Sequence, residues 1–302
     1  MTLLSLLARI LFTLHFSSST SMICLLLVMG IIGLWQLLKY KGYIPTLHYH
    51  LPQSSPDATT ACRVDVLGTY FQEIKNAYTK HPPDIAHRIM EQELLTAGSK
   101  QSLWVYLDGS PSKEKESTHA QREATRVESG ERAQVLLDDL QQKIEDRRSV
   151  RKQDFKQVGS MISKTFYWSL DSRNAFAAYL TQQGWSHVIQ ATTEADLAIA
   201  RDCQPGDVVV TRDSDLLIYP SVTRVYRAIS RNKYLEYDVQ DLSVALGMSR
   251  VQLTVLGVVS RNDYTSNIPS LGSKSNYKIV KSLSAQGRII DTNGEITDKG
   301  SL

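Results

Sequence analysis

Cysteine is scarce in this sequence, and its three cysteines lie far apart. Cys24, Cys62 and Cys203 are an odd number, and no two of them have the C-x-x-C spacing of a zinc or redox site. The seven histidines give one close pair, His48 and His50, with no cysteine or carboxylate nearby at zinc-ligand spacing. The sequence therefore favours neither a disulfide framework nor a zinc site, and it indicates a reducing compartment.

The chain also has little excess charge of either sign. Its 302 residues carry a formal net charge of +3, and 42% of them are hydrophobic. This composition is typical of one substantial core with at most one added lobe, and by itself it does not indicate nucleic-acid binding. Internal repeats are absent as well, which argues against a solenoid.

Acidic residues are missing from the first 28 positions, where Arg9 is the single Lys or Arg in a hydrophobic run. Three interpretations remain open. The first is that the run is a signal anchor, although the stretch from Met22 to Leu38 only reaches the lower limit of about 17 residues for a bilayer span. Alternatively it is an organelle-targeting peptide, or the protein starts at Met29 and residues 1–28 are a gene-model artefact.

Beyond this extension, short apolar runs alternate with helical periodicity. We expect strands over 62–67, 103–107, 185–190 and 207–211. We expect helices over 69–79, 194–202, 238–246 and 250–259. This alternation predicts an α/β domain with a mainly parallel sheet, whose ligands bind at the carboxyl ends of the strands.

The segment 112–154 differs from the rest because its charge is dense and mixed and its apolar content is low. It cannot form a core of its own. One interpretation is a solvated helix or a partly disordered insertion with many ion pairs. The other is a mobile basic element that grips phosphates.

Seven acidic residues follow the expected strands or the apolar helix after them. They are Asp65, Asp108, Glu194, Asp196, Asp213, Asp215 and Asp263. Any one alone is compatible with a helix N-cap, but the E-x-D and D-x-D pairs after successive strands form a specific pattern. Two like charges about 4 Å apart repel by roughly 4 kcal/mol at an effective dielectric of 20, so such a group requires cations. Hard oxygen ligands suit two Mg²⁺ ions, or Mn²⁺ as a substitute, which support phosphodiester hydrolysis.

Several short motifs carry these acids. They are V-D at Asp65, L-D-G at Asp108, E-A-D at Glu194, T-R-D-S-D ending at Asp215, and N-D-Y-T around Asp263. Together with M-G-I-I-G-L from Met29, they resemble the flap endonuclease family, or XPG-type structure-specific 5′ nucleases, over residues 29 to about 283. The resemblance implies a PIN-like nuclease domain with a charged helical arch and a C-terminal helix-turn-helix. Asp196 is shorter than the family's Glu, and Ser270 stands where the family prefers glycine.

The resemblance also implies roles for individual residues. Asp108, Glu194, Asp196 and Asp213 would hold one metal ion, Asp215 and Asp263 a second, and Asp65 would order bound water. Lys115 and Arg122 of the arch would hold the scissile phosphate. DNA contacts are expected at Gly30, Lys113, Arg126, Gly272 and Lys274.

From these observations we expect five regions: the extension 1–28, nuclease regions over 29–125 and 155–260, the arch over 112–154, and a truncated helix-turn-helix-like segment over 261–302. The expected function is metal-dependent cleavage of DNA at flaps or junctions. The alternative is an inactive PIN-like protein that binds nucleic acid or acts as a scaffold. The expected partner is DNA with a duplex/single-strand junction, bound by a monomer without a sliding-clamp motif. The resemblance favours the nucleus, whereas the extension, if retained, favours a mitochondrion or a membrane.

Overall fold

The computed structural model describes residues 34–52, 60–260, 272–285, 288–290 and 296–298. Met29, Gly30 and Asp263, to which the resemblance gives roles, lie outside these residues.

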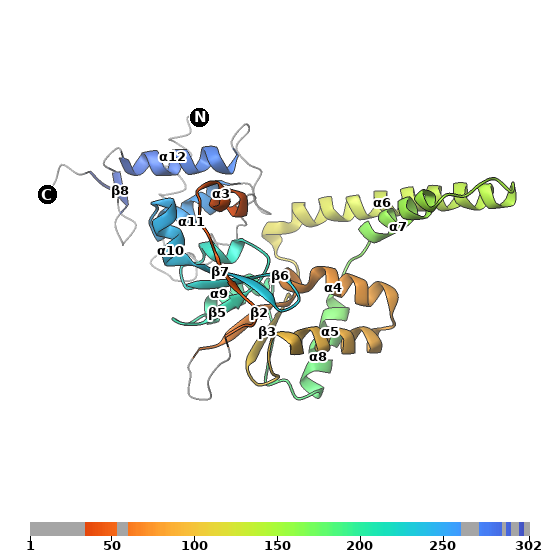
Figure 1. Ribbon diagram of the computed structural model, residues 1–302, viewed down its shortest axis with the longest axis horizontal. Helices are drawn as coiled ribbons and strands as arrows, with labels where there is room; N and C mark the ends of the chain where they lie inside the picture. Colours follow the sequence, from red (N-terminus) through yellow and green to blue (C-terminus); the bar gives the residue numbers. More distant parts are fainter. Residues whose placement is uncertain (1–33, 53–59, 261–271, 286–287, 291–295, 299–302) are drawn as a thin grey trace.

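A seven-stranded sheet forms the centre of the molecule (Figure 1). Its strands are β1 Thr46–His48, β2 Cys62–Asp65, β3 Leu103–Leu107, β4 His187–Gln190, β5 Val208–Val210, β6 Arg224–Ser230 and β7 Lys233–Asp238. They lie in the order β1-β7-β6-β5-β2-β3-β4. The five strands from β6 to β4 are parallel, and β7 and β1 add an antiparallel edge. The predicted α/β class with a mainly parallel sheet is confirmed.

Helices cover both faces of the sheet and enclose two hydrophobic cores. One core is formed with α4 Val66–Lys80, α5 Pro83–Ala97 and α8 Leu170–Gln182. The other is formed with α3 Leu34–Tyr40, α9 Ala195–Asp202, α10 Val239–Leu246, α11 Arg250–Val259, α12 Ser273–Ala285 and the 3-10 turn η2 Asp215–Ile218. Strand residues alternate between the cores, so Val64 and Val105 face the first and Tyr106 and Val209 face the second. Burial on both faces explains the apolar V-V-V run of β5.

Two expectations about these elements need correction. The strand expected over 62–67 ends at Asp65, because the Asp65 carboxylate accepts the Gly68 backbone N–H at 2.9 Å and caps α4. Val66 and Leu67 are therefore helical. The β6–β7 hairpin was not anticipated, because Tyr, Arg and Lys dilute its apolar alternation.

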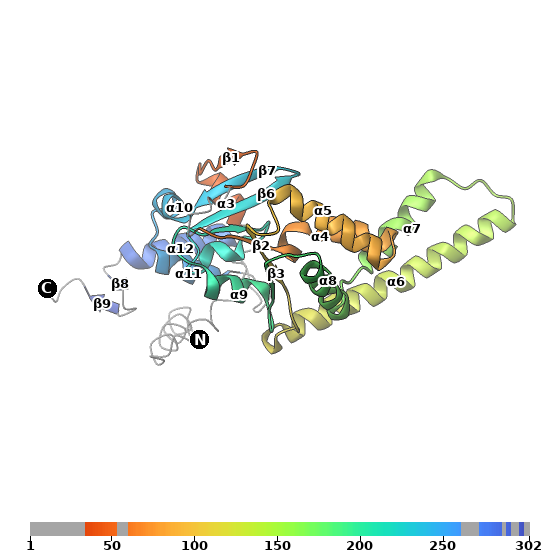
Figure 2. The same ribbon diagram turned by 90° about the horizontal axis from the view of Figure 1, so that it is seen from below.

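The charged segment is a helical hairpin that extends away from the body of the protein (Figures 1 and 2). It consists of the 3-10 turn η1 Lys113–Lys115, the long helix α6 Glu116–Glu145 and the antiparallel helix α7 Lys152–Lys164. At 1.5 Å per residue, the 30 residues of α6 span about 45 Å. The hairpin therefore continues to Lys164, beyond the expected end at residue 154. Of the solvated helix and the partly disordered insertion that the composition allowed, the structure has the helix.

A short ribbon of β8 Arg288–Ile290 and β9 Ile296–Asp298 follows α12. Within the residues that the structure covers, no helix alone has the length and apolar character to cross a membrane. Only α10 and α11 taken together, with a bend of 79° between them, reach such values.

Candidate functional site

Six acidic residues converge at the carboxyl edge of the parallel strands. Asp65 ends β2, and Asp108 directly follows β3 beside it. Asp213 and Asp215 follow β5 on the other side of β2, and Glu194 and Asp196 open α9 after β4. We call this set the acidic cluster: Asp65, Asp108, Glu194, Asp196, Asp213 and Asp215. Asp263, the seventh predicted ligand, lies outside the described residues.

Asp65 is the most enclosed member, with 3% of its surface exposed. Its carboxylate accepts hydrogen bonds from the Gly68 backbone N–H and the Thr211 hydroxyl, both at 2.9 Å. Burial, with the nearby Asp108 charge adding to it, raises the pKa of Asp65 to about 7. Its neighbours therefore fix the orientation of this carboxyl group without neutralising its charge.

Gly68 makes this arrangement possible, and sequence reasoning missed it. A Cβ atom on Gly68 would lie 1.9 Å from the Asp65 Oδ2 and 2.8 Å from the Thr211 Oγ1. Any side chain here would displace the carboxylate. A glycine in the first turn of a helix, three residues after a candidate ligand, was the available signal.

Asp108 is held in place by the start of α9. Its Oδ1 accepts the Ala195 backbone N–H at 2.8 Å, which ties β3 to the start of α9. Burial raises the pKa of Asp108, and the Glu194 charge also raises it, against lowering by the Ala195 N–H, Arg173 and Lys115.

Gly109, the residue after Asp108, is also closely packed. A Cβ on Gly109 would lie 2.0 Å from the Ala191 carbonyl oxygen, so only glycine fits between β3 and the loop after β4. The buried Arg173 donates to the Gly109 and Trp168 carbonyl oxygens, both at 2.9 Å. Arg173 is a second supporting residue that sequence reasoning missed, because nothing in the α8 sequence marks it.

Ionisation of the Asp196 and Asp215 carboxyl groups is strongly disfavoured in the cluster. Burial raises the pKa of each well above its ordinary value. The charge of Asp213 adds to both shifts, whereas Lys115 opposes both. Asp213 itself is exposed, and its Oδ1 accepts the Asp215 backbone N–H at 3.3 Å. Such mutual repulsion is expected where carboxylates are arranged to bind cations.

Lys115 brings a positive charge from the hairpin into this environment. It is buried, and its Nζ contacts the Glu194 carboxylate, which also accepts the Ser112 hydroxyl at 3.3 Å. The base of the hairpin therefore sits on the acidic cluster. The predicted neighbourhood of Lys115 and the ligands is present in the structure, and Lys113 is exposed on the same turn.

The other predicted hairpin residues lie further out. Arg122 is exposed on α6, about 10 Å further along the helix axis than Lys115. Arg126 forms an ion pair with Glu123, and its guanidinium lies 4.6 Å from the Tyr167 ring centroid. Arg126 therefore holds the hairpin to its own return segment.

The donor chemistry of the cluster fits hard divalent cations, since every side chain supplies carboxylate oxygens. Nonetheless, in the described ranges no three His, Cys, Asp or Glu side chains are already placed to hold one ion. Several carboxylate oxygens are instead taken up by the Gly68 and Ala195 N–H groups and by Lys115. Metal binding would thus require local rearrangement of side chains that the backbone already brings to one edge.

The turn that carries Asp215 is supported from behind by the start of α11. The guanidinium of Arg250 donates to the carbonyl oxygens of Leu217, Tyr219 and Val222, the first at 2.8 Å. Burial lowers the pKa of Arg250 to about 10. Three backbone acceptors thus hold a partly buried cation, which fixes the path of η2.

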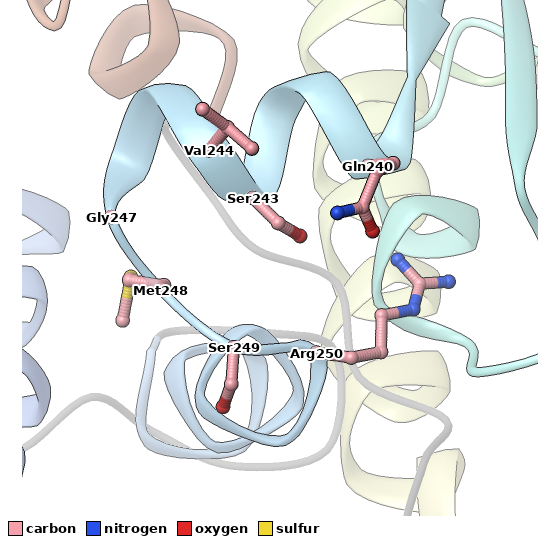
Figure 3. A pocket seen from close by; sticks show the side chains of 7 residues that line it. All are labelled: Gln240, Ser243, Val244, Gly247, Met248, Ser249 and Arg250. Atoms are coloured by element: carbon pink, nitrogen blue, oxygen red, sulfur yellow. The ribbon is translucent and has the colours of Figure 1, made fainter.

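A hollow of about 330 Å³ lies at the elbow between α10 and α11 (Figure 3). It is lined by Gln240, Ser243, Val244, Gly247, Met248, Ser249 and Arg250. None of these belongs to the acidic cluster. We therefore assign it no catalytic role.

The predicted contacts near the C-terminus gather beside α3. The Nζ of Lys274 on α12 lies 4.0 Å from the ring centroid of Tyr40, and that of Lys41 lies 4.1 Å from the ring of Tyr277. Gly272 is exposed directly before α12. These residues form a basic surface, and their contacts with DNA stay a prediction.

Comparison with known proteins identifies similar chains. No protein-family model matches. The chain is 24% identical over 234 residues to flap endonuclease 1 of Babesia bovis, which covers 76% of this chain. Two structures of the catalytic core of Rad2 in complex with DNA substrate align with TM-scores of 0.52 and 0.51, at 16% and 14% identity. Each alignment covers 84% of this chain, and 70% and 69% of the Rad2 chains, respectively.

The resemblance to flap endonuclease and XPG-type nucleases is confirmed, and the chain has their PIN-like α/β fold. The chain spans about a third of the curated relative's length, since the matched region is 32% of that protein.

Proposed function

We propose that this chain, with the fold of the Rad2 catalytic core, is a divalent-metal-dependent nuclease that hydrolyses DNA where duplex meets a 5′ single strand. The observation that carries the proposal is the acidic cluster, whose six members come from four strand ends and meet at one edge of the sheet. Buried acids with raised pKa values beside a basic side chain are typical of catalytic sites.

The residues would divide their work as the resemblance suggests. Asp108, Glu194, Asp196 and Asp213 would hold one ion, and Asp215 with Asp263 a second. Bound Mg²⁺ would supply Lewis-acid chemistry for attack by water on phosphorus.

The protein's other groups position the substrate. Asp65, fixed by Gly68 and Thr211, would orient water at the cluster. Lys115 would move its Nζ from Glu194 to the scissile phosphate and neutralise the charge that develops there. Arg122, which is exposed on α6, would hold the scissile phosphate together with Lys115.

A second candidate is a protein of this fold that binds nucleic acid without cutting it. It is favoured by one observation, that no three acids in the described part of the chain are already placed to hold an ion. Folds persist when chemistry is lost, so fold alone does not decide between the two candidates.

The deciding experiment is cleavage of a 5′-labelled flap substrate by the purified protein, with Mg²⁺ and with excess EDTA. The proposal expects a defined product with Mg²⁺, none with EDTA, and restoration by Mn²⁺. Tight binding without a product in either metal would establish the second candidate.

The proposal extends to partners and location. DNA with a duplex/single-strand junction is the proposed ligand, bound by a monomer, and the resemblance favours the nucleus. If residues 1–28 are retained, a mitochondrion or a membrane is the proposed location instead.

A further inference from the structure

The hairpin distributes its charge unevenly along its length. The parts nearer the body, residues 113–140 and 157–164, have six basic and seven acidic residues together. The outer part, residues 141–156, has six basic and three acidic residues. The positive charge is thus concentrated at the end that projects furthest from the sheet (Figure 2).

Ion pairs occur in both parts of the hairpin. In the inner part, Arg132 is paired with Glu128 on the same helix, as Arg126 is with Glu123. At the outer end, Asp146 pairs with Arg148, and Asp154 with Lys143. Exposed basic side chains with no ion pair to a described residue remain there: Arg147, Lys152 and Lys156.

An exposed aromatic ring lies among these cations. Phe155 is 57% exposed on the second turn of α7. Lys152 is three positions before it, on the same helix face, and Lys156 is adjacent. Surfaces that combine cations with an accessible aromatic ring are typical of single-strand binding, because phosphates meet the charges and a base stacks on the ring. A duplex, whose bases are already stacked, would leave Phe155 unused.

The helix length places this surface far from the acidic cluster. Lys115 at the base of the hairpin contacts Glu194, and α6 then runs about 45 Å to its outer end. In Figures 1 and 2 the outer end of the hairpin and α12 lie at opposite ends of the molecule. The outer end of the hairpin therefore offers contacts that are distinct from those at the cluster.

We propose that the hairpin tip, residues 147–156, is a second binding site for single-stranded nucleic acid. Phe155 stacks on a base, and Arg147, Lys152 and Lys156 contact phosphates. The choice of nucleic acid as the ligand rests on the proposed function. The site itself rests on the charges and exposure of the tip.

The test measures binding of fluorescein-labelled oligo(dT) by anisotropy, in EDTA so that no strand is cut. We expect Phe155→Ala to weaken binding about tenfold, and Phe155→Trp to restore it. Changing Arg147, Lys152 and Lys156 together to Gln should reduce the slope of log K against log salt by about 2, since each phosphate contact contributes about 0.7 for single strands. Matched controls are Ile162→Ala and Lys164→Gln, which alter exposed residues at the inner end of α7. Both should stay within about twofold of wild type.

Two results would overturn the proposal. One is that the tip variants and the control variants weaken oligo(dT) binding equally, or that neither group weakens it. The other is tighter binding of an equally long duplex whose affinity depends on the same tip residues. Circular dichroism verifies that each variant keeps its helices. Because these measurements need no cleavage, a protein that binds through the tip but cuts nothing would refute the proposed function alone. A protein that cuts flaps but shows no tip dependence in binding would refute this inference alone.

Discussion

The Nζ of Lys115 contacts the Glu194 carboxylate, although 79 positions separate the two residues in the chain. The contact joins the first turn of the hairpin to the N-cap residue of α9. A protein cation therefore reaches the acidic cluster in the same place where divalent ions are proposed to bind.

Lys115→Met should slow single-turnover cleavage by on the order of 10² to 10³, because a charge that meets the developing phosphate charge is lost. The dissociation constant for DNA should change much less. Lys113→Met on the same turn is the matched comparison, since it removes an exposed charge that does not contact Glu194. Equal rate effects of the two variants would contradict a specific role for Lys115.

Asp108→Asn should reduce cleavage by more than about 10³ while leaving DNA binding nearly intact. The substitution removes one ligand charge and hardly changes shape. Its amide Oδ1 can still accept the Ala195 N–H, so the junction of β3 and α9 should persist. Single-turnover kinetics and anisotropy binding measure the two effects, and a near wild-type rate would remove Asp108 from the ligand set.

Asp65→Asn should change how stability depends on pH in the absence of metal. Burial, with Asp108 adding to it, raises the pKa of Asp65 to about 7, against an ordinary value of about 4. The folded protein thus holds this proton more tightly than the unfolded chain, so the wild type loses stability as pH rises from about 4 to about 7. The variant lacks that loss and should melt higher than wild type at pH 7 in EDTA, but not at pH 4. Asp171→Asn, at an exposed position on α8, is the control, and melting scans that show no difference between the two would contradict the assignment.

Gly68→Ala should destabilise the protein by about 1–3 kcal/mol and also reduce cleavage, because the new methyl group would overlap the Asp65 carboxylate. Gly159→Ala in α7 offers a direct contrast. Nothing lies within 4 Å of a Cβ there, so the same change should stabilise the helix by roughly 0.5–1 kcal/mol. Denaturant unfolding measures both changes. If both variants gained stability, the close packing around Gly68 would be wrong.

Arg250→Lys should raise the Mg²⁺ concentration needed for half-maximal cleavage severalfold and lower the melting temperature. A lysine keeps the charge but cannot reach three carbonyl oxygens, so the turn that begins with Asp215 loosens. Thr254→Val, which removes the hydroxyl contacts to the Ile218 and Arg250 carbonyl oxygens, should have a smaller effect in the same direction. Mn²⁺ binding followed by calorimetry provides a measurement independent of cleavage. Unchanged metal affinity in both variants would restrict Arg250 to a role in stability.

The sheet and the acidic cluster could be predicted from the sequence because the relevant patterns are local. An apolar run followed by Asp marks both a strand and its carboxyl end, and the ends of parallel strands must meet at one edge. Asp65, Asp108 and Asp213 were identified in this way. The predicted start and end of β3 also agree with the structure.

The supporting residues could not be predicted because their partners are distant in sequence. Arg173 bonds to Gly109 over 64 positions, and Arg250 bonds to Leu217 over 33. Neither contact leaves a periodic pattern along the chain. The hairpin was equally hard to define, since α6 has apolar residues on several faces and gains its order from packing against α7.

The place where the hairpin is inserted has an evolutionary consequence. It leaves the body after β3 and returns before α8, so insertions or deletions within it do not change the register of any strand. Each helical turn gained or lost in both arms would alter its reach by about 5.4 Å. Homologous genes could therefore lengthen or shorten this arm by small in-frame changes, and so select different nucleic-acid structures while keeping the same set of carboxylates.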